Sequence, residues 1–250
     1  MSRVPRRIIY CSRDSRAQHE AMGFYPEHGC VLENGFDTAR FSFSAEERAK
    51  TRAHLKLDVN EIVVGNVARF DVAKGHSDLL EAFAQAASKV KALKLVLIGR
   101  GIVQSNREIT SLLERLGISH RVLLLGEQES LETIYPAFDI YCSSSLNEGF
   151  PNAISEAMAC EIPCVVTDTG ASKQLVQDIG IVVRRGRPLE LSGAMVRFAD
   201  MSRNERTALG QKLRERIVQK HSLDSAADCY SEMYRQSILE TGSGVHSHTA

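Results

Sequence analysis

The sequence has no tryptophan, only 6% aromatic residues and no excess of either charge, with 31 Lys+Arg against 31 Asp+Glu. A formal net charge of zero argues against a broad surface for nucleic acid or for anionic membranes. No apolar run approaches the length of about 18 residues that a membrane-spanning helix needs. With 250 residues, of which 43% are hydrophobic and 25% charged, the chain has the composition of one large or two small globular domains.

Six cysteines are scattered along the chain without a Cys-x-x-Cys pair. This usage is typical of reduced thiols in a cytoplasmic protein, and it makes a zinc site an unfavoured interpretation. Residues 1–11 are basic but contain no apolar segment of the kind that a secretory signal carries. The sequence therefore predicts a cytoplasmic protein without a metal ion.

Short apolar runs alternate with helical segments from about residue 60 onward. The runs are rich in Val, Ile and Leu without a period of two, as expected for strands that helices cover on both faces. They occupy 61–65, 94–99, 121–126, 137–142, 163–167 and 180–183. Between them, apolar residues recur at three- and four-residue spacing. These strand–helix–strand units predict an α/β fold with a doubly wound, Rossmann-like parallel sheet.

The two ends of the chain have a different pattern. A buried strand is expected over 7–12 and a short helix over 16–22, and so small a unit cannot bury its own faces. It either joins an edge of the main sheet or is the remainder of a larger unit. Further helices are expected over 44–57, 205–220 and 224–239.

The segment after the fourth strand combines two glutamates with a predicted helix start. Pro151 suits the first helical position, so Glu148 lies in the loop before it and Glu156 in the second helical turn. Open α/β sheets bind ligands at the carboxyl ends of their strands, where the free N–H groups of 150–153 can hold an anion. Flanking carboxylates would accept hydrogen bonds from vicinal hydroxyls, as a nucleotide sugar requires. The spacing alone leaves open two glutamates on a solvated surface.

A second loop places a glycine and two cations beside the first of these strands. Gly65 permits close approach to the backbone, and Arg69 and Lys74 follow it. Two cations could neutralise a diphosphate, at about 1.5–3 kcal/mol per charged hydrogen bond. Taken alone, the two cations also fit a polar surface loop. Gly99 leaves room for a flat base, although a lone Gly-x-Gly discriminates little.

The histidines show no pattern of catalytic partners. His54, His76 and His120 are expected at the surface or at helix caps. The sequence contains no recognisable Ser-His-Asp arrangement and no cluster with metal-ligand spacing.

The order of these segments resembles the C-terminal, donor-binding half of retaining glycosyltransferases of the GT-B fold, family 4 type. The resemblance covers about residues 5–240 and includes a hinge-like Asn-Gly-x-Asp at 34–37, the 65–75 loop and Gly99. Its signature is the pair Glu148 and Glu156 within Glu-Gly-Phe-Pro-Asn…Glu-Ala-Met-Ala. The last helix is similar to the family's crossover helix.

The resemblance implies a role for each candidate residue. Arg69 and Lys74 would bind the donor's diphosphate and stabilise its developing charge, and Glu148 would contact the donor sugar, so these three are the expected catalytic residues. Glu156 would bind the ribose hydroxyls. The other expected donor-binding residues are Gly65, Gly99, Leu125, Gly126, Phe150, Pro151, Asn152 and Ala153. No metal ion and no cofactor besides the nucleotide sugar are expected.

The resemblance also implies a domain organisation. Residues 1–40 would be a remnant of the N-terminal acceptor domain plus the hinge, and 41–223 the donor-binding domain. Residues 224–240 would form the crossover helix and 241–250 a flexible tail. Because the acceptor domain is largely missing, we expect a chain that binds a nucleotide sugar without transferring it, unless a separate polypeptide or a second copy supplies that domain.

Three functions remain open at this point. The first is transfer of a sugar to a glycan or lipid-linked acceptor in surface polysaccharide synthesis, in the cytoplasm or at the inner face of the membrane. The second is nucleotide-sugar binding without catalysis, as a relic or regulatory subunit. The third, a doubly wound nucleotide-sugar epimerase, needs a two-domain cleft that this length does not provide. One departure from the family is Glu161, where glycine is usual, at a cost of about 1 kcal/mol if φ is positive there.

Overall fold

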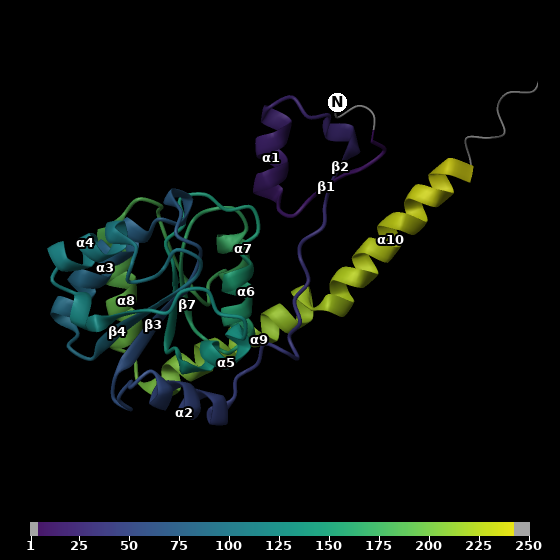
Figure 1. Cartoon of the computed structure of the whole chain (residues 1–250). Helices are drawn as coiled ribbons and strands as arrows, with labels where there is room; N and C mark the ends of the chain where they lie inside the picture. Colours follow the sequence, from purple (N-terminus) through teal and green to yellow (C-terminus); the bar gives the residue numbers. More distant parts are fainter. Residues whose placement is uncertain (1–4, 243–250) are drawn as a thin grey trace, which may run out of the picture.

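The computed structural model describes residues 5–242, and its main body is a six-stranded parallel sheet (Figure 1). The strand order is β5-β4-β3-β6-β7-β8. The strands are β3 (Ile62–Val67), β4 (Leu93–Ile98), β5 (Val122–Leu124), β6 (Ile140–Ser143), β7 (Cys164–Thr167) and β8 (Ile181–Val183). Each of the six apolar runs therefore overlaps one of these strands, and the predicted doubly wound sheet is confirmed.

Helices cover both faces of this sheet, which explains why its strands lack a period of two. Leu95 of β4 faces one core, and its neighbour Val96 faces the other. The first core is covered by α3 (His76–Lys89), α4 (Arg107–Arg115) and α8 (Pro188–Ala199). The second is covered by α5 (Leu131–Ile134), α6 (Asn152–Ala159), α7 (Ser172–Val176) and α9 (Arg203–His221) (Figure 1).

The strand order reverses beside β3, and this reversal positions the candidate site. From β3 the chain passes through α3 to β4 and then β5 on one side, and it returns to β6 on the other side. The loops that follow β3 and β6 therefore diverge at the carboxyl edge of the sheet. A crevice forms at such a switch point in doubly wound folds.

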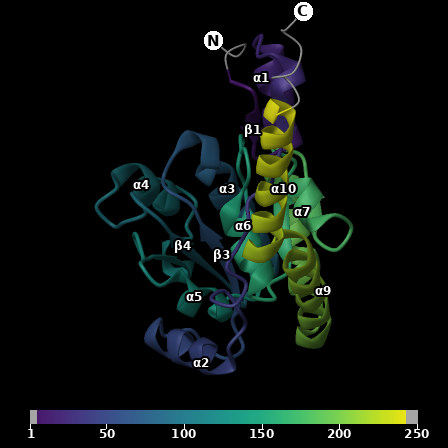
Figure 2. The same cartoon turned by 90° about the vertical axis from the view of Figure 1, so that its right-hand side faces the viewer.

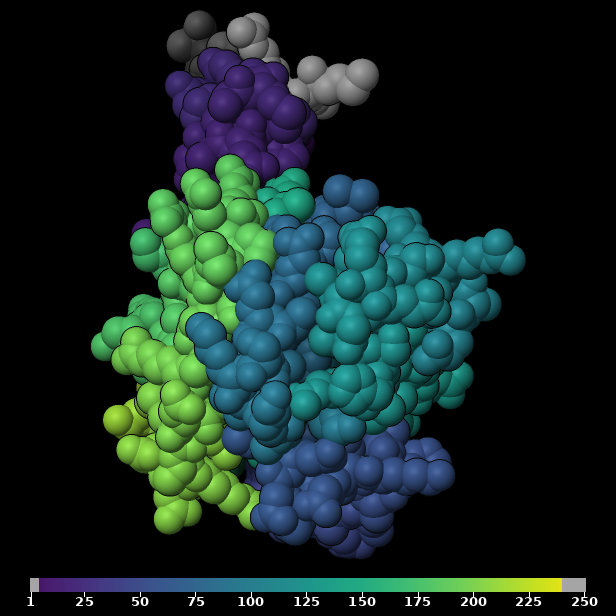
Figure 3. Space-filling view, turned by 90° about the vertical axis from the view of Figure 1, so that its left-hand side faces the viewer, coloured from purple at the N-terminus to yellow at the C-terminus, as the bar shows by residue number. Residues whose placement is uncertain are grey.

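The N-terminal segment forms a small unit of its own. β1 (Ile8–Tyr10) pairs in parallel with β2 (Gly29–Val31) in a separate two-stranded sheet, so of the two alternatives left open, the one in which it joins an edge of the main sheet is excluded. The helix α1 (Arg13–Ala21) begins earlier than predicted because the Ser12 hydroxyl caps it, accepting from the Ser15 N–H at 3.0 Å. Figure 3 shows this unit standing above the main body.

The C-terminal helices match the prediction closely. α9 ends at His221, Ser222 adopts an extended conformation, and α10 (Leu223–Gly242) leads away from the main body (Figures 1 and 2). A parallel bridge joins Ser222 to Phe36 of the hinge-like segment. Of the tail predicted over 241–250, the first two residues belong to α10, and 243–250 lie outside the described residues.

Two helix ends show where backbone geometry overrides periodicity. α2 (Ala45–His54) stops before the predicted Leu57, because Lys56 adopts φ +54° and Leu57 turns into the core. After α6, Glu161 adopts φ +61°, so the suspected left-handed position is confirmed. A Cβ on Gly210 would lie 1.8 Å from the Glu161 carbonyl oxygen, so α9 packs tightly against this turn.

Candidate donor-binding site

A polar crevice lies at the switch point and consists of two adjoining cavities. The first, of about 280 Å³, is lined by Asn66, Val67, Ala68, Arg69, Lys74, Tyr141, Ser143, Ser145, Glu148, Phe150, Pro151, Asn152, Ala153 and Ile154. The second, of about 330 Å³, is lined by Val67, Ala68, Arg69, Ile98, Gly99, Arg100, Glu127, Gln128 and Leu131. They meet at 67–69, and we call them together the donor crevice.

A half-buried ion pair links the loops on the two sides of the first cavity. Lys74 Nζ lies 2.5 Å from Glu148 Oε1, and the side chains are 17% and 12% exposed. The Ser145 hydroxyl donates to the same oxygen at 2.7 Å. Lys74 ends a short 3-10 helix (Val72–Lys74), and at Gly75, with φ +61°, a Cβ would lie 2.2 Å from a carbonyl oxygen of the opposite loop. The two predicted partners of a diphosphate sugar thus face each other.

Arg69 lies where the two cavities join, and it is the more exposed cation. Its Nη2 lies 3.1 Å from Asp71 Oδ2, with the Arg69 side chain 54% exposed. Asp71 also accepts from the Ala73 N–H, and this bond, followed by the nearby Arg69, lowers the pKa of Asp71. Because an exposed ion pair is weak, Arg69 can leave Asp71 and bind an anion in either cavity at a small cost in free energy.

The start of α6 faces the first cavity, one residue later than predicted. Pro151 precedes the helix instead of occupying its first position, and Asn152 is the first helical residue. The N–H groups of Asn152 and Ala153 have no backbone acceptor within the described residues. The arrangement is that of a helix N-terminus open to an anion, as the sequence predicted.

Glu156 does not face the donor crevice directly, unlike Glu148. Its Oε2 accepts a hydrogen bond from the Tyr135 hydroxyl at 2.8 Å, and that hydroxyl also lies 3.2 Å from the Ala153 carbonyl oxygen. Burial raises the pKa of Glu156. Of the four charged side chains that were expected to converge, Arg69, Lys74 and Glu148 line the donor crevice. Glu156 does not line it, and is connected to its wall through the Tyr135 hydroxyl, which contacts both Glu156 and Ala153.

Of the three candidate glycines, Gly99 lines the donor crevice, whereas Gly65 and Gly126 do not. Gly99, with φ +145°, lines the second cavity, and a Cβ there would lie 2.1 Å from the Ala68 carbonyl oxygen. The donor-binding role predicted for Gly65 is wrong. A Cβ on Gly65 would lie 2.1 Å from the Phe138 ring, so this glycine allows close packing beneath the site. Leu125 and Gly126 lie behind the wall, where Leu125 accepts a bond from Gln128 and Gly126 from the Gly99 N–H.

Several crevice residues were not predicted from the sequence. Asn66 donates to the Cys142 carbonyl at 2.8 Å, and its buried Oδ1 has no partner within the described residues. Tyr141, Ser143 and Ser145 come from β6 and the loop after it. The available signal was a polar side chain inside or directly after an apolar run, which is unusual for a buried strand.

His76 corrects a further expectation. His54 and His120 are exposed, but His76 is only 4% exposed, and neither of its ring nitrogens has a hydrogen-bond partner in the part of the chain that the structure describes. Burial lowers its pKa to about 4, so the imidazole is neutral at pH 7. It packs against Phe70 at the start of α3.

Residues 5–242 contain neither a candidate metal site nor a helix that could span a membrane. No group of three or more His, Cys, Asp or Glu side chains is placed to hold a metal ion there. None of the helices described is both long enough and apolar enough to cross a membrane.

Curated relatives match this chain over part of their own length. D-inositol 3-phosphate glycosyltransferase of Rhodococcus erythropolis is 28% identical, over 96% of this chain and 55% of its own length. N-acetyl-alpha-D-glucosaminyl L-malate synthase of Bacillus anthracis is 26% identical, over 74% of this chain and 48% of its own. The chain thus spans about half the length of these curated relatives.

Solved structures share the fold. Anabaena HepE in complex with UDP and glucose superposes with a TM-score of 0.87 at 24% identity, over 94% of this chain and 64% of its own. The glycosyl transferases group 1 family matches residues 61–201, which contain β3 to β8 and all three residues predicted to be catalytic. Since that match covers more than half of the sequence, the chain belongs to the group 1 glycosyltransferases and has the Rossmann-like fold of a GT-B lobe.

Proposed function

We propose that the chain binds a nucleoside diphosphate sugar as the donor lobe of a retaining glycosyltransferase. The observation that carries the proposal is the Lys74–Glu148 pair, which lies between Arg69 and the open start of α6 at the switch point of the sheet. Anabaena HepE, which shares this fold, has been solved in complex with UDP and with UDP-glucose, which supports this class of ligand.

Each part of such a donor has a matching part of the crevice. The diphosphate replaces Glu148 as the partner of Lys74 and is also bound by Arg69, which together stabilise the charge of the leaving group. The freed Glu148 accepts hydrogen bonds from sugar hydroxyls, and the N–H groups of Asn152 and Ala153 donate to the sugar or phosphate. The base stacks in the second cavity near Gly99. No metal ion takes part in this scheme.

Glu156 binds the ribose in this proposal, with Tyr135 as its positioning residue. The Tyr135 hydroxyl occupies Oε2 only, so Oε1 remains an acceptor for a ribose hydroxyl. Ala153, whose carbonyl the same Tyr135 hydroxyl contacts, lines the first cavity.

Transfer itself requires an acceptor site, and we propose that residues 1–40 do not supply a complete one. The expected acceptor is a glycan or a lipid-linked sugar, in line with a relative of Campylobacter jejuni that is named as a diphospho-undecaprenol 4-alpha-N-acetylgalactosaminyltransferase. The chain alone then binds the donor and transfers no sugar until an acceptor domain is present. Binding without any catalytic role is the alternative.

Calorimetric titration with UDP and GDP tests the donor site. We expect one nucleotide per chain, and Glu156→Ala should weaken binding by about 1–3 kcal/mol, the range of a lost hydrogen bond. Lys74→Ala should weaken it further, whereas Lys89→Ala, an exposed cation at the far end of α3, should bind as the wild type does. Chelation by EDTA should leave the affinity unchanged. Absence of heat with both nucleotides, or equal affinities in all variants, contradicts the assignment.

A further inference from the structure

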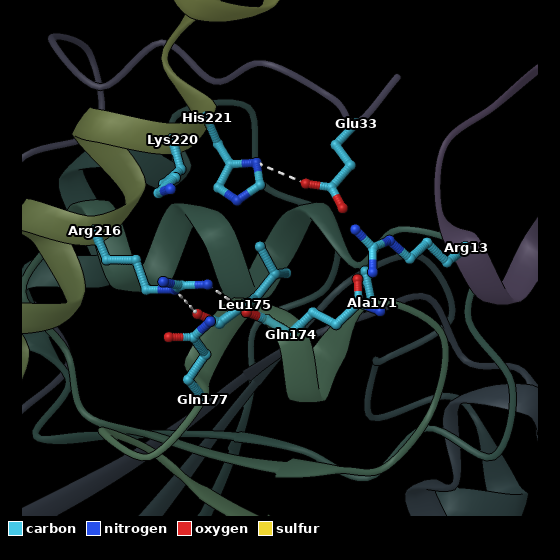
Figure 4. A pocket seen from close by; sticks show the side chains of 9 residues that line it. All are labelled: Arg13, Glu33, Ala171, Gln174, Leu175, Gln177, Arg216, Lys220 and His221. Carbon is cyan, nitrogen blue, oxygen red and sulfur yellow. Dashed lines mark hydrogen bonds and ion pairs between the residues drawn. The ribbon is translucent and has the colours of Figure 1, made fainter. Parts of the chain in front are cut away.

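A second polar pocket, the hinge pocket, lies apart from the donor crevice. It has a volume of about 360 Å³ and is enclosed by α1, the segment at Glu33, α7 and α9 (Figure 4). None of its lining residues lines the donor crevice. Nothing in the proposed donor binding uses it.

Three cations and a single carboxylate line the hinge pocket. Arg13 reaches in from α1, and Arg216 and Lys220 come from α9 (Figure 4). The side chains of Arg13 and Lys220 make no hydrogen bond or ion pair within residues 5–242, whereas Arg216 donates to the carbonyls of Leu175 and Gln174 at 2.7 Å. With Glu33 as the only carboxylate, the lining carries an excess of two positive charges.

A buried histidine adds a polar group without a full set of partners. His221 is 6% exposed, and its Nδ1 lies 3.5 Å from Glu33 Oε2, beyond a normal hydrogen bond. Its other ring nitrogen is turned into the pocket and has no partner in the described chain (Figure 4). Burial and the neighbouring Arg216 lower the pKa of His221 to about 4, so the imidazole is neutral at pH 7. This ring nitrogen is therefore available to exchange a hydrogen bond with a polar occupant of the pocket.

We propose that the hinge pocket binds a small phosphorylated polyol, such as a sugar phosphate. The phosphate binds between Arg13 and Lys220, where charge-assisted hydrogen bonds are strongest. The hydroxyls bind His221, Glu33 and the Gln174 amide on the remaining wall. A pocket of this volume accommodates a compact ligand, and its mainly polar lining disfavours an apolar one.

Calorimetric titration with glucose 6-phosphate tests this proposal. We expect one molecule bound per chain, no measurable binding of glucose, and at least tenfold weaker binding of glucose 6-phosphate to the double variant Arg13→Gln/Lys220→Gln. Both side chains are exposed and unpaired, so the variant should fold normally, and a melting curve checks this. Lys212→Gln removes an exposed cation of α9 outside the pocket and should change the affinity less than twofold.

The donor crevice could also take a phosphate, so Lys74→Ala is titrated in parallel and should retain full affinity for glucose 6-phosphate. The proposal is overturned if the wild type gives no heat at millimolar ligand, or if Lys74→Ala alone abolishes the binding. Equal weakening in Lys212→Gln also overturns it, since general charge would then explain the result. UDP should bind the double variant as tightly as the wild type; failure of UDP to bind either protein counts against the donor site only.

Discussion

The Lys74–Glu148 ion pair allows stability and ligand binding to be separated in one experiment. Lys74→Met removes the ammonium group, keeps most of the side-chain volume and leaves the Glu148 carboxylate, 12% exposed, without its cation. Breaking a buried pair from one side costs about 3–5 kcal/mol. Because Ser145 still donates to Glu148 and the crevice admits water, we expect the free energy of unfolding to fall by about 2–3 kcal/mol.

The double variant Lys74→Met/Glu148→Gln supplies the matched comparison. It contains no uncompensated charge, so it should be more stable than the sum of the two single changes predicts, by about 1–2 kcal/mol. UDP binding should remain as weak as in Lys74→Met, because the cation that receives the diphosphate is still absent. Stability is thus expected to recover while affinity does not.

Urea unfolding followed by circular dichroism measures the stabilities at pH 7, and calorimetry measures the affinity for UDP. Lys89→Met, on the exposed end of α3, controls for the loss of a lysine charge and should leave both quantities unchanged. Strict additivity of the two single variants would show that the pair is not coupled in the folded chain. Recovery of UDP affinity in the double variant would refute the role given to Lys74.

Three further predictions concern titration and backbone strain. Burial raises the pKa of Glu156, so the contribution of this carboxyl to stability should decrease as pH rises above its ordinary value of 4.5, which is measured as the difference between the wild type and Glu156→Gln; by urea titration and calorimetry, Glu156→Gln should be more stable at pH 7 and bind UDP less tightly. The pKa values of His76 and His221 are lowered to about 4, so stability should fall from pH 6.5 to 4 by up to about 3 kcal/mol per imidazole, and His76→Gln should reduce the slope. Glu161→Gly should raise the melting temperature by about 2–4 °C, because relief of the left-handed strain outweighs a 3.9 Å contact with Arg214; a lower value would contradict the strain.

The sheet could be predicted because its physical cause is visible in sequence. Strands buried on both faces must be apolar throughout, as Leu95 and Val96 illustrate by facing different cores. Element ends were less predictable, because single local interactions decide them. The Ser12 cap lengthens α1, Lys56 ends α2 through its positive φ, and a 3-10 helix around Pro136 delays β6 until Ile140.

The site could be predicted where it depends on loop position and not where it depends on distant packing. Lys74 and Glu148 follow strands that prove to be neighbours, so their placement at one edge follows from the topology. The orientation of Glu156 depends on Tyr135, and the role of Gly65 depends on Phe138, a ring from another part of the chain. No local pattern reports such partners.

The loop that carries Glu148 is supported from outside the main sheet. The ring of Phe150 stacks on Phe36 at 5.8 Å between centroids and lies 5.8 Å from the His221 ring. The Asn34 amide donates to the Asn152 side chain at 2.9 Å. Phe36 and Asn34 belong to the segment that leads from the N-terminal unit, and His221 precedes α10, so both connections to the main body meet at this loop. Because packed contacts of this kind shift together and not singly, a displacement of the N-terminal unit or of α10 would move Phe150 and alter the donor crevice.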